Sequence, residues 1–480
     1  MADIAPLLEL HKNNATALRT EIAPAWVEDA PYRGTASILW SCVVALAACV
    51  YSTLHLNIPA PGRMGYWPVF WKKTGWVFTV LFAPEVVLVV ACGEFLKARW
   101  LQCKLRALNS SEPKAGDVSL RYCFFVVMGG LKVLVGDLIT EAELKGSAEL
   151  RKLFRDSTAV LSPEGVVQLA RLGHMLNVAD TTIDDRSKAS IVQKFVVLTQ
   201  VFWLLLHCIV RLAQGLPLAL LEVHISVHIV VAGFMYAFWL QKPLDVVEGM
   251  ILDRRPWESA LMLMVELAIY KHSELYLYRR FPTEEPVVVD SKKELQDFYF
   301  GDLIEKQVKA MKWVALPSTG GCLEADEVLP SGIGFKGRRQ TADISPTQLA
   351  RLDGIASVLG DVEQGNSHTG SGFLILPVLY GGIHLFAWNF PFVTENEMMF
   401  WKISCITVMT GTVLVTPVVI LLDRHCTGTQ RERLWFIPIA ICFLYIFARV
   451  FIVVESFISL RGERIGVFLS PPWLQNFPHV

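Results

Sequence analysis

The chain has 480 residues, of which 53% are hydrophobic and only 19% are charged, and its formal net charge is -1. Together with a mean hydropathy of +0.42, this composition excludes an ordinary soluble globular protein and indicates a membrane protein. A sequence pI near 6.8 argues against a nucleic-acid partner, which would require a basic surface. We therefore expect an integral, multi-pass protein of an endomembrane or the plasma membrane, with the lipid bilayer as its main partner and no nucleic acid.

Residues 1–34 form the expected N-terminal extramembrane head. They lack the basic segment and apolar core of a cleavable signal peptide. We expect the first apolar run to serve as the targeting signal instead.

Runs of about 20 apolar residues are long enough for a helix to cross a hydrocarbon core about 30 Å thick. Seven runs are of this kind: Thr35 to Leu56, Trp76 to Phe95, Phe195 to Leu212, Leu216 to Leu240, Phe373 to Trp388, Trp401 to Leu422 and Leu434 to Ile458. They predict an all-α polytopic transmembrane bundle of about seven to eight spans, divided into a hairpin at 35–96, a hairpin at 191–240 and a C-terminal bundle at 372–458, followed by a tail at 459–480.

An eighth apolar run, Tyr122 to Ile139, carries Lys132, Asp137 and paired glycines. These residues leave open whether the run crosses the membrane, re-enters it or lies at its surface.

Two polar segments, 97–190 and 241–371, are expected to be extramembrane and partly helical. In the first, Ser162, Pro163 and Glu164 suit an N-cap, the first helical position and the positive end of the helix dipole. The second repeats the Ser-Pro opening and the residues Gln-Leu-Ala-Arg-Leu between Ile344 and Leu359. Two interpretations remain open: two unrelated capped helices, or a duplicated unit that docks at the membrane surface.

The distribution of Lys and Arg favours a cytoplasmic location for both polar segments and for the loop after Leu422, although the loop with Lys72 and Lys73 disagrees. Seven spans would place the N-terminus in the cytoplasm and the C-terminus outside. An eighth span would move the N-terminal head to the other side of the membrane. Asn14 and Asn109 begin glycosylation sequons that are usable only on the outer side.

Several segments together resemble one large group of proteins. They read RGTASILWSCVVALAACVYSTLHLNIPAPG, LFAPEVVLVVACGEF, IDDRSKASIVQKFVVLTQVFW, LEVHISVHIVVAGFMYAFWLQKPLDV, YGGIHLFAWNFPF and ARVFIVVESFISLRGERIGVFLSPPWLQNFPHV. The chain resembles, from about Arg33 to its C-terminus, an uncharacterised family of filamentous-fungal polytopic integral membrane proteins. The resemblance implies a fungal membrane protein, and some members of the group lie in gene neighbourhoods for specialised metabolism, which implies an accessory role there.

Ionisable side chains inside apolar runs need a partner or a water-filled cavity, because an unpaired charge in hydrocarbon costs several kcal/mol. The candidates are Glu85, His207, Glu222, His224, His228, His384, Arg449 and Glu455. Among them Glu85, Glu222 and His207 are the catalytic candidates, and for each of them structural hydrogen bonding is the competing interpretation.

His224 and His228 are four residues apart and share one helix face, so they make half of a metal site. Glu222 points elsewhere, and an HExxH arrangement is absent. We therefore expect hydrogen bonds and no metal, and the cofactor stays undetermined. His55 with Asn57, and His384 with Asn389, each mark a helix end; as functional groups they would line the mouth of a shared cavity.

A turn of about three residues around Gly215 makes the third and fourth runs antiparallel neighbours. His207 and Glu222 are equally distant from this turn and therefore lie at one depth. We predict that they hydrogen-bond or approach within the reach of a water molecule, while His224 and His228 face a different helix or cavity.

No motif defines a reaction. The acidic stretch Asp180 to Lys188 departs in spacing from known diphosphate-binding patterns and is interpreted as a salt-bridged helix start. Three functions stay open: a membrane protein accessory to specialised metabolism, a membrane-embedded enzyme of the cyclase or transferase type acting on a lipophilic small molecule, and a transporter or export factor.

Overall fold

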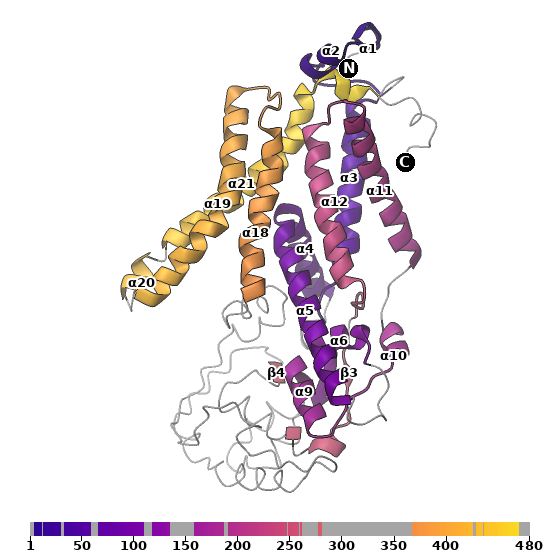
Figure 1. The fold of residues 1–480 in the computed structure, drawn as a ribbon, viewed down its shortest axis with the longest axis vertical. Helices are drawn as coiled ribbons and strands as arrows, with labels where there is room; N and C mark the ends of the chain where they lie inside the picture. The colour runs from indigo at the N-terminus through magenta and orange to yellow at the C-terminus, as the bar shows by residue number, and fades with distance from the viewer. Residues whose placement is uncertain are drawn as a thin grey trace.

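The computed structural model describes residues 4–11, 13–29, 33–58, 66–109, 118–134, 158–186, 191–246, 248–258, 260–261, 277–280, 367–425, 429–434 and 436–469. The described chain is mostly helical. Long helices form a bundle, two short head helices lie at one end of it, and a small unit with a sheet lies at the other end (Figure 1). The head helices are α1 (Ala5–His11) and α2 (Ala15–Thr20).

Four helices of the described chain are long and apolar enough to cross a membrane. They are α3 (Thr35–Thr53), α12 (Leu220–Trp239), the Glu395–Val419 part of α19 (Glu395–His425) and α21 (Phe436–Ile458), the last continuing into η4 (Ser459–Gly462). Shorter apolar stretches belong to α11 (Ile191–Ala213) and to α18 (Ser367–His384) with η3 (Leu385–Ala387). These helices are compatible with the expected membrane localisation, whereas the count of seven to eight spans stays a prediction.

The expected span from Trp76 to Phe95 is not one continuous helix. The chain instead forms α4 (Tyr66–Phe82) and α5 (Pro84–Asn109), whose axes differ by 112°. Pro84 explains the break, because proline lacks an N–H for the preceding turn and fits the first position of a new helix. The two helices meet beside the middle of α12 (Figure 1), so a break in the chain lies inside the bundle.

The run from Tyr122 to Ile139 does not form a spanning helix. Its described part consists of the last residues of the short helix α6 (Leu120–Val127), a turn at Gly129, whose φ is 85°, and the strand β1 (Leu131–Leu134). Lys132 therefore lies on a strand, and the described apolar residues of the run join the main core, in which the Phe124 ring contacts that of Phe95 on α5.

This unit corrects the all-α expectation. Its four-stranded sheet has the order β3-β1-β2-β4, with β2 at Thr158–Leu161, β3 at Met250–Ile251 and β4 at Leu277–Arg280. The neighbours of β1 are β2, which is antiparallel, and β3, which is parallel; β2 also pairs antiparallel with β4. Since β1 and β2 come from the first polar segment and β3 and β4 from the second, both segments build one sheet.

Short helices lie near the sheet in the chain: α9 (Pro163–Arg171), which contacts β2 and α5, α10 (Asp180–Asp184), which contacts α6, and η1 (Arg255–Trp257). The predicted helix start is confirmed, because Ser162 Oγ accepts a hydrogen bond from Gly165 N at 2.9 Å and Pro163 opens α9. The repeated stretch after Ile344 lies outside the described residues.

The head and the C-terminal segment pair with each other at one end of the bundle. Ile22 forms an antiparallel bridge with Arg464, just before η5 (Ile465–Phe468), and Ala23 N donates to Glu463 O at 2.8 Å. The head and the segment around Arg464 therefore lie at the same end of the bundle, while the side of a membrane that each chain end faces stays a prediction.

Candidate functional site

Buried polar side chains meet in the middle of the bundle, where α4 and α5 break. We call this group the central site; its members are the buried Glu85, His224, His228, Tyr380, His384, Trp401 and Arg449 and the partly buried Tyr445. They come from α5, α12, α18, α19 and α21, and His228 and Arg449 each lie near the middle of their helices. Five helices that are distant in sequence thus share one polar centre.

An ion pair between Glu85 and Arg449 is the charged part of the central site. Both side chains are buried. Tyr445 lies one helical turn before Arg449, and its hydroxyl donates to Glu85 Oε1 at 2.7 Å while accepting from Arg449 Nη2 at 2.9 Å. The guanidinium carbon of Arg449 also lies 3.9 Å from the centre of the Tyr380 ring. Within the described residues, the side chains of this pair are held by aromatic groups and by charge, through hydrogen bonds between side chains.

Three histidines form the neutral part of the central site. His384 Nδ1 lies 2.8 Å from Tyr380 O, and His224 Nδ1 lies 3.0 Å from His384 Nε2. A carbonyl only accepts, so His384 carries its proton on Nδ1 and His224 donates to His384 Nε2. His224 Nε2 is then an acceptor, and it has no hydrogen-bond partner among the described residues.

His228 contacts the broken helix. Its Nδ1 lies 3.1 Å from His224 O, and its Nε2 lies 3.1 Å from Leu81 O in the last turn of α4. A neutral imidazole donates one hydrogen bond, so a neutral His228 donates to one of these two carbonyls. The prediction that His224 and His228 face a different helix from Glu222 is confirmed, because their partners lie on α18 and α4.

Four buried atoms of the central site lack a hydrogen-bond partner within the described residues: Glu85 Oε2, Arg449 Nη1, His224 Nε2 and Trp401 Nε1. Atoms of the same kind occur elsewhere in the described chain, among them Arg33 Nη1, Arg211 Nε and Glu463 Oε2. Leaving such atoms unpaired costs about 1–3 kcal/mol each. In the central site they include both donors and acceptors, which a bound molecule or water would pair.

A second buried group, the end cluster, lies where the head meets the C-terminal segment. It consists of Arg33, Arg211, Glu222 and Glu463. Arg211 donates to the carbonyl oxygens of Leu469, Pro217, Gly466 and Val467 at 2.7–3.0 Å. Glu463 accepts from Leu220 N at 3.2 Å. The end cluster therefore holds chain segments together mainly through their backbones.

Glu222 belongs to this cluster. Its Oε1 lies 2.5 Å from Arg33 Nη2 and 4.0 Å from His207 Nδ1, and its Oε2 accepts from Ala219 N at 2.9 Å. The predicted approach of His207 to Glu222 is confirmed at the distance that one water bridges. Its main partner, Arg33, was not predicted, because residue 33 precedes the first apolar run.

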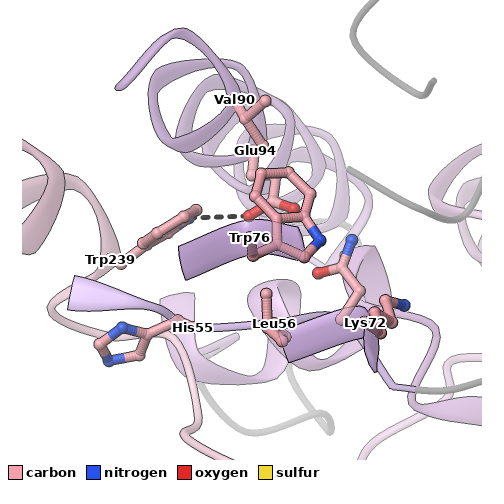
Figure 2. A pocket seen from close by; sticks show the side chains of 8 residues that line it. His55, Leu56, Lys72, Trp76, Val90, Glu94 and Trp239 are labelled. Atoms are coloured by element: carbon pink, nitrogen blue, oxygen red, sulfur yellow. Dashed lines mark hydrogen bonds between the residues drawn. The ribbon is translucent and has the colours of Figure 1, made fainter. Parts of the chain in front are cut away.

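The lower pocket lies at the opposite end of α12, and Figure 2 shows its lining. Its residues are His55, Leu56, Asn57, Lys72, Trp76, Val90, Glu94 and Trp239. Lys242 Nζ donates to Glu94 Oε2 at 2.6 Å and to Asn57 Oδ1 at 2.8 Å, and the Trp239 indole donates to Glu94 at 2.7 Å. Burial lowers the pKa of Lys242, and Glu94 opposes this effect. The open space is about 10 Å³, which holds about one water molecule.

The expected shared cavity of His55, Asn57, His384 and Asn389 is wrong. His55 lies against Trp239 at the end of α12, whereas His384 contacts His224 near its start. The 15 residues between 224 and 239 correspond to about 22 Å of helix. The two motifs do end helices as expected, but α3 and α18 run in opposite directions, so these ends are far apart.

The remaining candidates lie apart from the central site. Glu455 is buried further along α21, and Asn389 accepts from Arg464 through its backbone oxygen at 3.2 Å. Asn14 is the N-cap of α2, and Asn109 is the last residue of α5. In the acidic stretch, Asp180 opens α10, and Asp184, the last residue of α10, pairs with Arg121. The described residues include no group of three or more His, Cys, Asp or Glu side chains placed to hold a metal ion.

Sequence reasoning missed Tyr380, Trp401 and Tyr445 of the central site. A usable signal was present, because Tyr380 precedes His384, and Tyr445 precedes Arg449, by four residues each. Side chains at this spacing share one helix face. A polar pair on one face of an apolar helix therefore predicts which face points toward a buried partner.

The fold and the central site define a helical protein whose apolar helices suit a membrane and enclose buried charges. A family of unknown function (DUF8562) matches residues 7–274 and 342–480, and the chain belongs to this family. The match omits residues 275–341, which lie largely outside the described residues. No curated protein and no solved structure matches the chain.

Proposed function

We propose that the protein is a membrane transporter that binds a small polar solute at the central site. The observation that carries this proposal is the broken helix pair, because α4 ends and α5 begins beside an ion pair in the middle of the bundle. Membrane transporters commonly bind solutes at discontinuous helices, whose ends offer backbone groups and dipoles inside an apolar surrounding.

The unpaired atoms of the central site support binding. They include two acceptors, Glu85 Oε2 and His224 Nε2, and two donors, Arg449 Nη1 and Trp401 Nε1. A solute with both kinds of group would pair them and lower their cost. The side-chain contacts of Glu85 and Arg449 can also rearrange without breaking a helix.

The test uses the full-length protein in liposomes. The liposomes are incubated with a water-soluble metabolite extract and washed, and their contents are identified by mass spectrometry. Wild type is expected to enrich at least one solute over protein-free liposomes, and Arg449→Ala is expected to abolish this enrichment. Arg461→Ala, which removes a more exposed partner of Glu397 on the same α21–η4 continuation, is the matched control and is expected to behave as wild type.

Two outcomes contradict this proposal. Absence of any enriched solute overturns transport, and conversion of a metabolite into a new product favours the alternative of a membrane-embedded enzyme. The fungal origin and the role in specialised metabolism stay proposals that rest on the resemblance. Deletion of the gene followed by metabolite profiling tests that role, and accumulation of an end product inside the cell would favour export.

A further inference from the structure

The hydrogen bonds of Arg449 leave one side of its guanidinium open. Nη2 contacts Glu85 and Tyr445, and Nε donates to the Tyr445 hydroxyl at 3.2 Å. Tyr380 covers a face of the group at 3.9 Å. Nη1 is buried and has no hydrogen-bond partner in the described parts of the chain. The orientation of the guanidinium is thus fixed, while Nη1 can still donate hydrogen bonds to a bound molecule.

Resting on the proposed transport function, we propose that the solute is a small organic carboxylate and that one proton is carried with it on Glu85. A fixed guanidinium recognises a carboxylate through two parallel hydrogen bonds. The central site would present Arg449 Nη1 and Nη2 to the solute once Nη2 is released from Glu85. Trp401 Nε1 supplies a further unpaired donor.

The charges around Arg449 explain the proton. The titratable and charged groups that face the ion pair are Tyr445 on α21, Tyr380 and His384 on α18, His224 and His228 on α12, and the Cys405 thiol on α19. Arg449 is the one permanent cation among these described groups. With Glu85 ionised, a bound carboxylate would leave a net negative charge in an apolar bundle, which is costly.

Protonation of Glu85 removes this conflict. The neutral carboxyl keeps the hydrogen bond to Tyr445, while Arg449 exchanges the Glu85 carboxylate for that of the solute. The total charge is unchanged, because one proton and one carboxylate enter together. Glu85 Oε2, now without a hydrogen-bond partner in the described chain, is the atom that would carry the proton. The start of α5 further favours a negative group nearby.

A single guanidinium also selects the class of anion. Phosphate at neutral pH carries up to two charges and would require a second cation. No lysine or second arginine belongs to the central site as the described residues define it. A carboxylate matches one guanidinium in both charge and planar shape.

In the experiment, liposomes that contain the full-length protein are incubated with an equimolar mixture of six solutes. The solutes are gluconate, pyruvate, succinate, glucitol, glycerol and inorganic phosphate. Luminal contents are measured by mass spectrometry with an acidic exterior and with equal pH on both sides. We expect wild type to enrich one or more carboxylates, and to enrich them more strongly with the acidic exterior. Arg449→Lys, which keeps the charge and loses the planar fork, should reduce this enrichment by about tenfold or more.

Glu85→Gln tests the proton. This variant resembles the protonated side chain, so the ratio of enrichment between the two pH conditions should fall to unity. Glu94→Gln, which changes the other buried carboxylate of α5, is the matched control and should keep the wild-type ratio. Each variant is first checked for a monodisperse elution profile, and Glu85→Asp replaces Glu85→Gln if the latter aggregates, with a changed pH ratio as the expected result.

The two proposals can fail separately. Enrichment of polyols or phosphate in place of carboxylates, or a wild-type enrichment that ignores the pH difference, overturns the carboxylate and proton assignment. If none of the six solutes is enriched while the metabolite extract yields another solute, the substrate class is wrong and transport stands. If both assays yield nothing, transport itself is wrong.

Discussion

The end cluster and the central site both bury charge in the same helical bundle, but they pair it in different ways. In the end cluster, Arg211 contacts four backbone carbonyls, and Glu463 contacts a backbone amide. In the central site, Glu85, Tyr445 and Arg449 contact one another through side chains. Backbone contacts fix the path of the chain, whereas side-chain contacts can be exchanged for those of a solute. The pairing partner therefore separates Arg211 and Glu463, which hold the backbone, from the Glu85–Arg449 pair, although the end cluster also contains the side-chain pair of Arg33 and Glu222.

The largest expected effect is that of Arg211→Leu. It removes the donors for the carbonyls of Leu469, Pro217, Gly466 and Val467 and leaves buried acceptors unpaired. We expect a loss of about 3–5 kcal/mol in the free energy of unfolding, measured by thermal unfolding in detergent. Arg461→Leu, at a more exposed position, is the control. A similar small change in both variants would contradict a structural role for the end cluster.

A double replacement in the central site sharpens the comparison. Arg449→Met alone leaves Glu85 buried without its counter-ion and should cost about 3 kcal/mol. Glu85→Met with Arg449→Met removes both charges and should recover most of this stability, while solute enrichment in liposomes stays absent. Unfolding and enrichment are measured on the same preparations. Recovery of enrichment in the double variant would show that the ion pair has no part in binding.

The packing around the central site allows a smaller test. A Cβ at Gly381 on α18 would lie 2.6 Å from Met409 Cγ and 2.9 Å from Cys405 O on α19. Gly381→Ala should therefore separate these helices and cost about 1–3 kcal/mol. At Gly382, the next residue of the same helix, a Cβ would meet no atom within 4 Å. Gly382→Ala is the matched control, and equal melting temperatures would refute close packing of α18 against α19.

The sequence predicted the parts of this fold that depend on local pattern. The apolar runs correspond to α3, α11, α12, α18, α19 and α21, and the depth of His207 and Glu222 followed from the short turn at Gly215. The sheet was missed because its strands have only two to four residues. Such strands carry too little alternation to be recognised, and they pair across two segments that are distant in the chain.

The central site was predicted in part for a similar reason. Glu85, His224, His228, His384 and Arg449 were recognised as ionisable residues in apolar runs, but no pattern pairs Glu85 with Arg449. Rotation about each helix axis is determined by packing against several neighbours, and it decides which side chains meet. Pro84 stands beside Glu85 in the sequence, whereas the bend of 112° depends on how both helices pack.

The smallest expected effect concerns the pH dependence of the end cluster. Burial raises the pKa of Glu463 well above its ordinary value, a nearby Glu222 adds to this, and the Leu220 amide, Arg464 and Arg33 oppose it. A raised folded-state pKa means that the folded protein holds the proton more tightly than the unfolded chain does. Its contribution to stability is therefore present at acidic pH and is lost as pH rises through the folded-state pKa.

We expect the melting temperature of wild type to fall with rising pH more steeply than that of Glu463→Gln, whose amide keeps an acceptor for Leu220 N and cannot ionise. Glu21→Gln, a more exposed carboxylate beside the same bridge, is the control and should keep the wild-type slope. Parallel pH profiles for wild type and Glu463→Gln would show that Glu463 is already ionised in the folded protein, and the end cluster would then hold its two carboxylates as a charged network with Arg33 and Arg211.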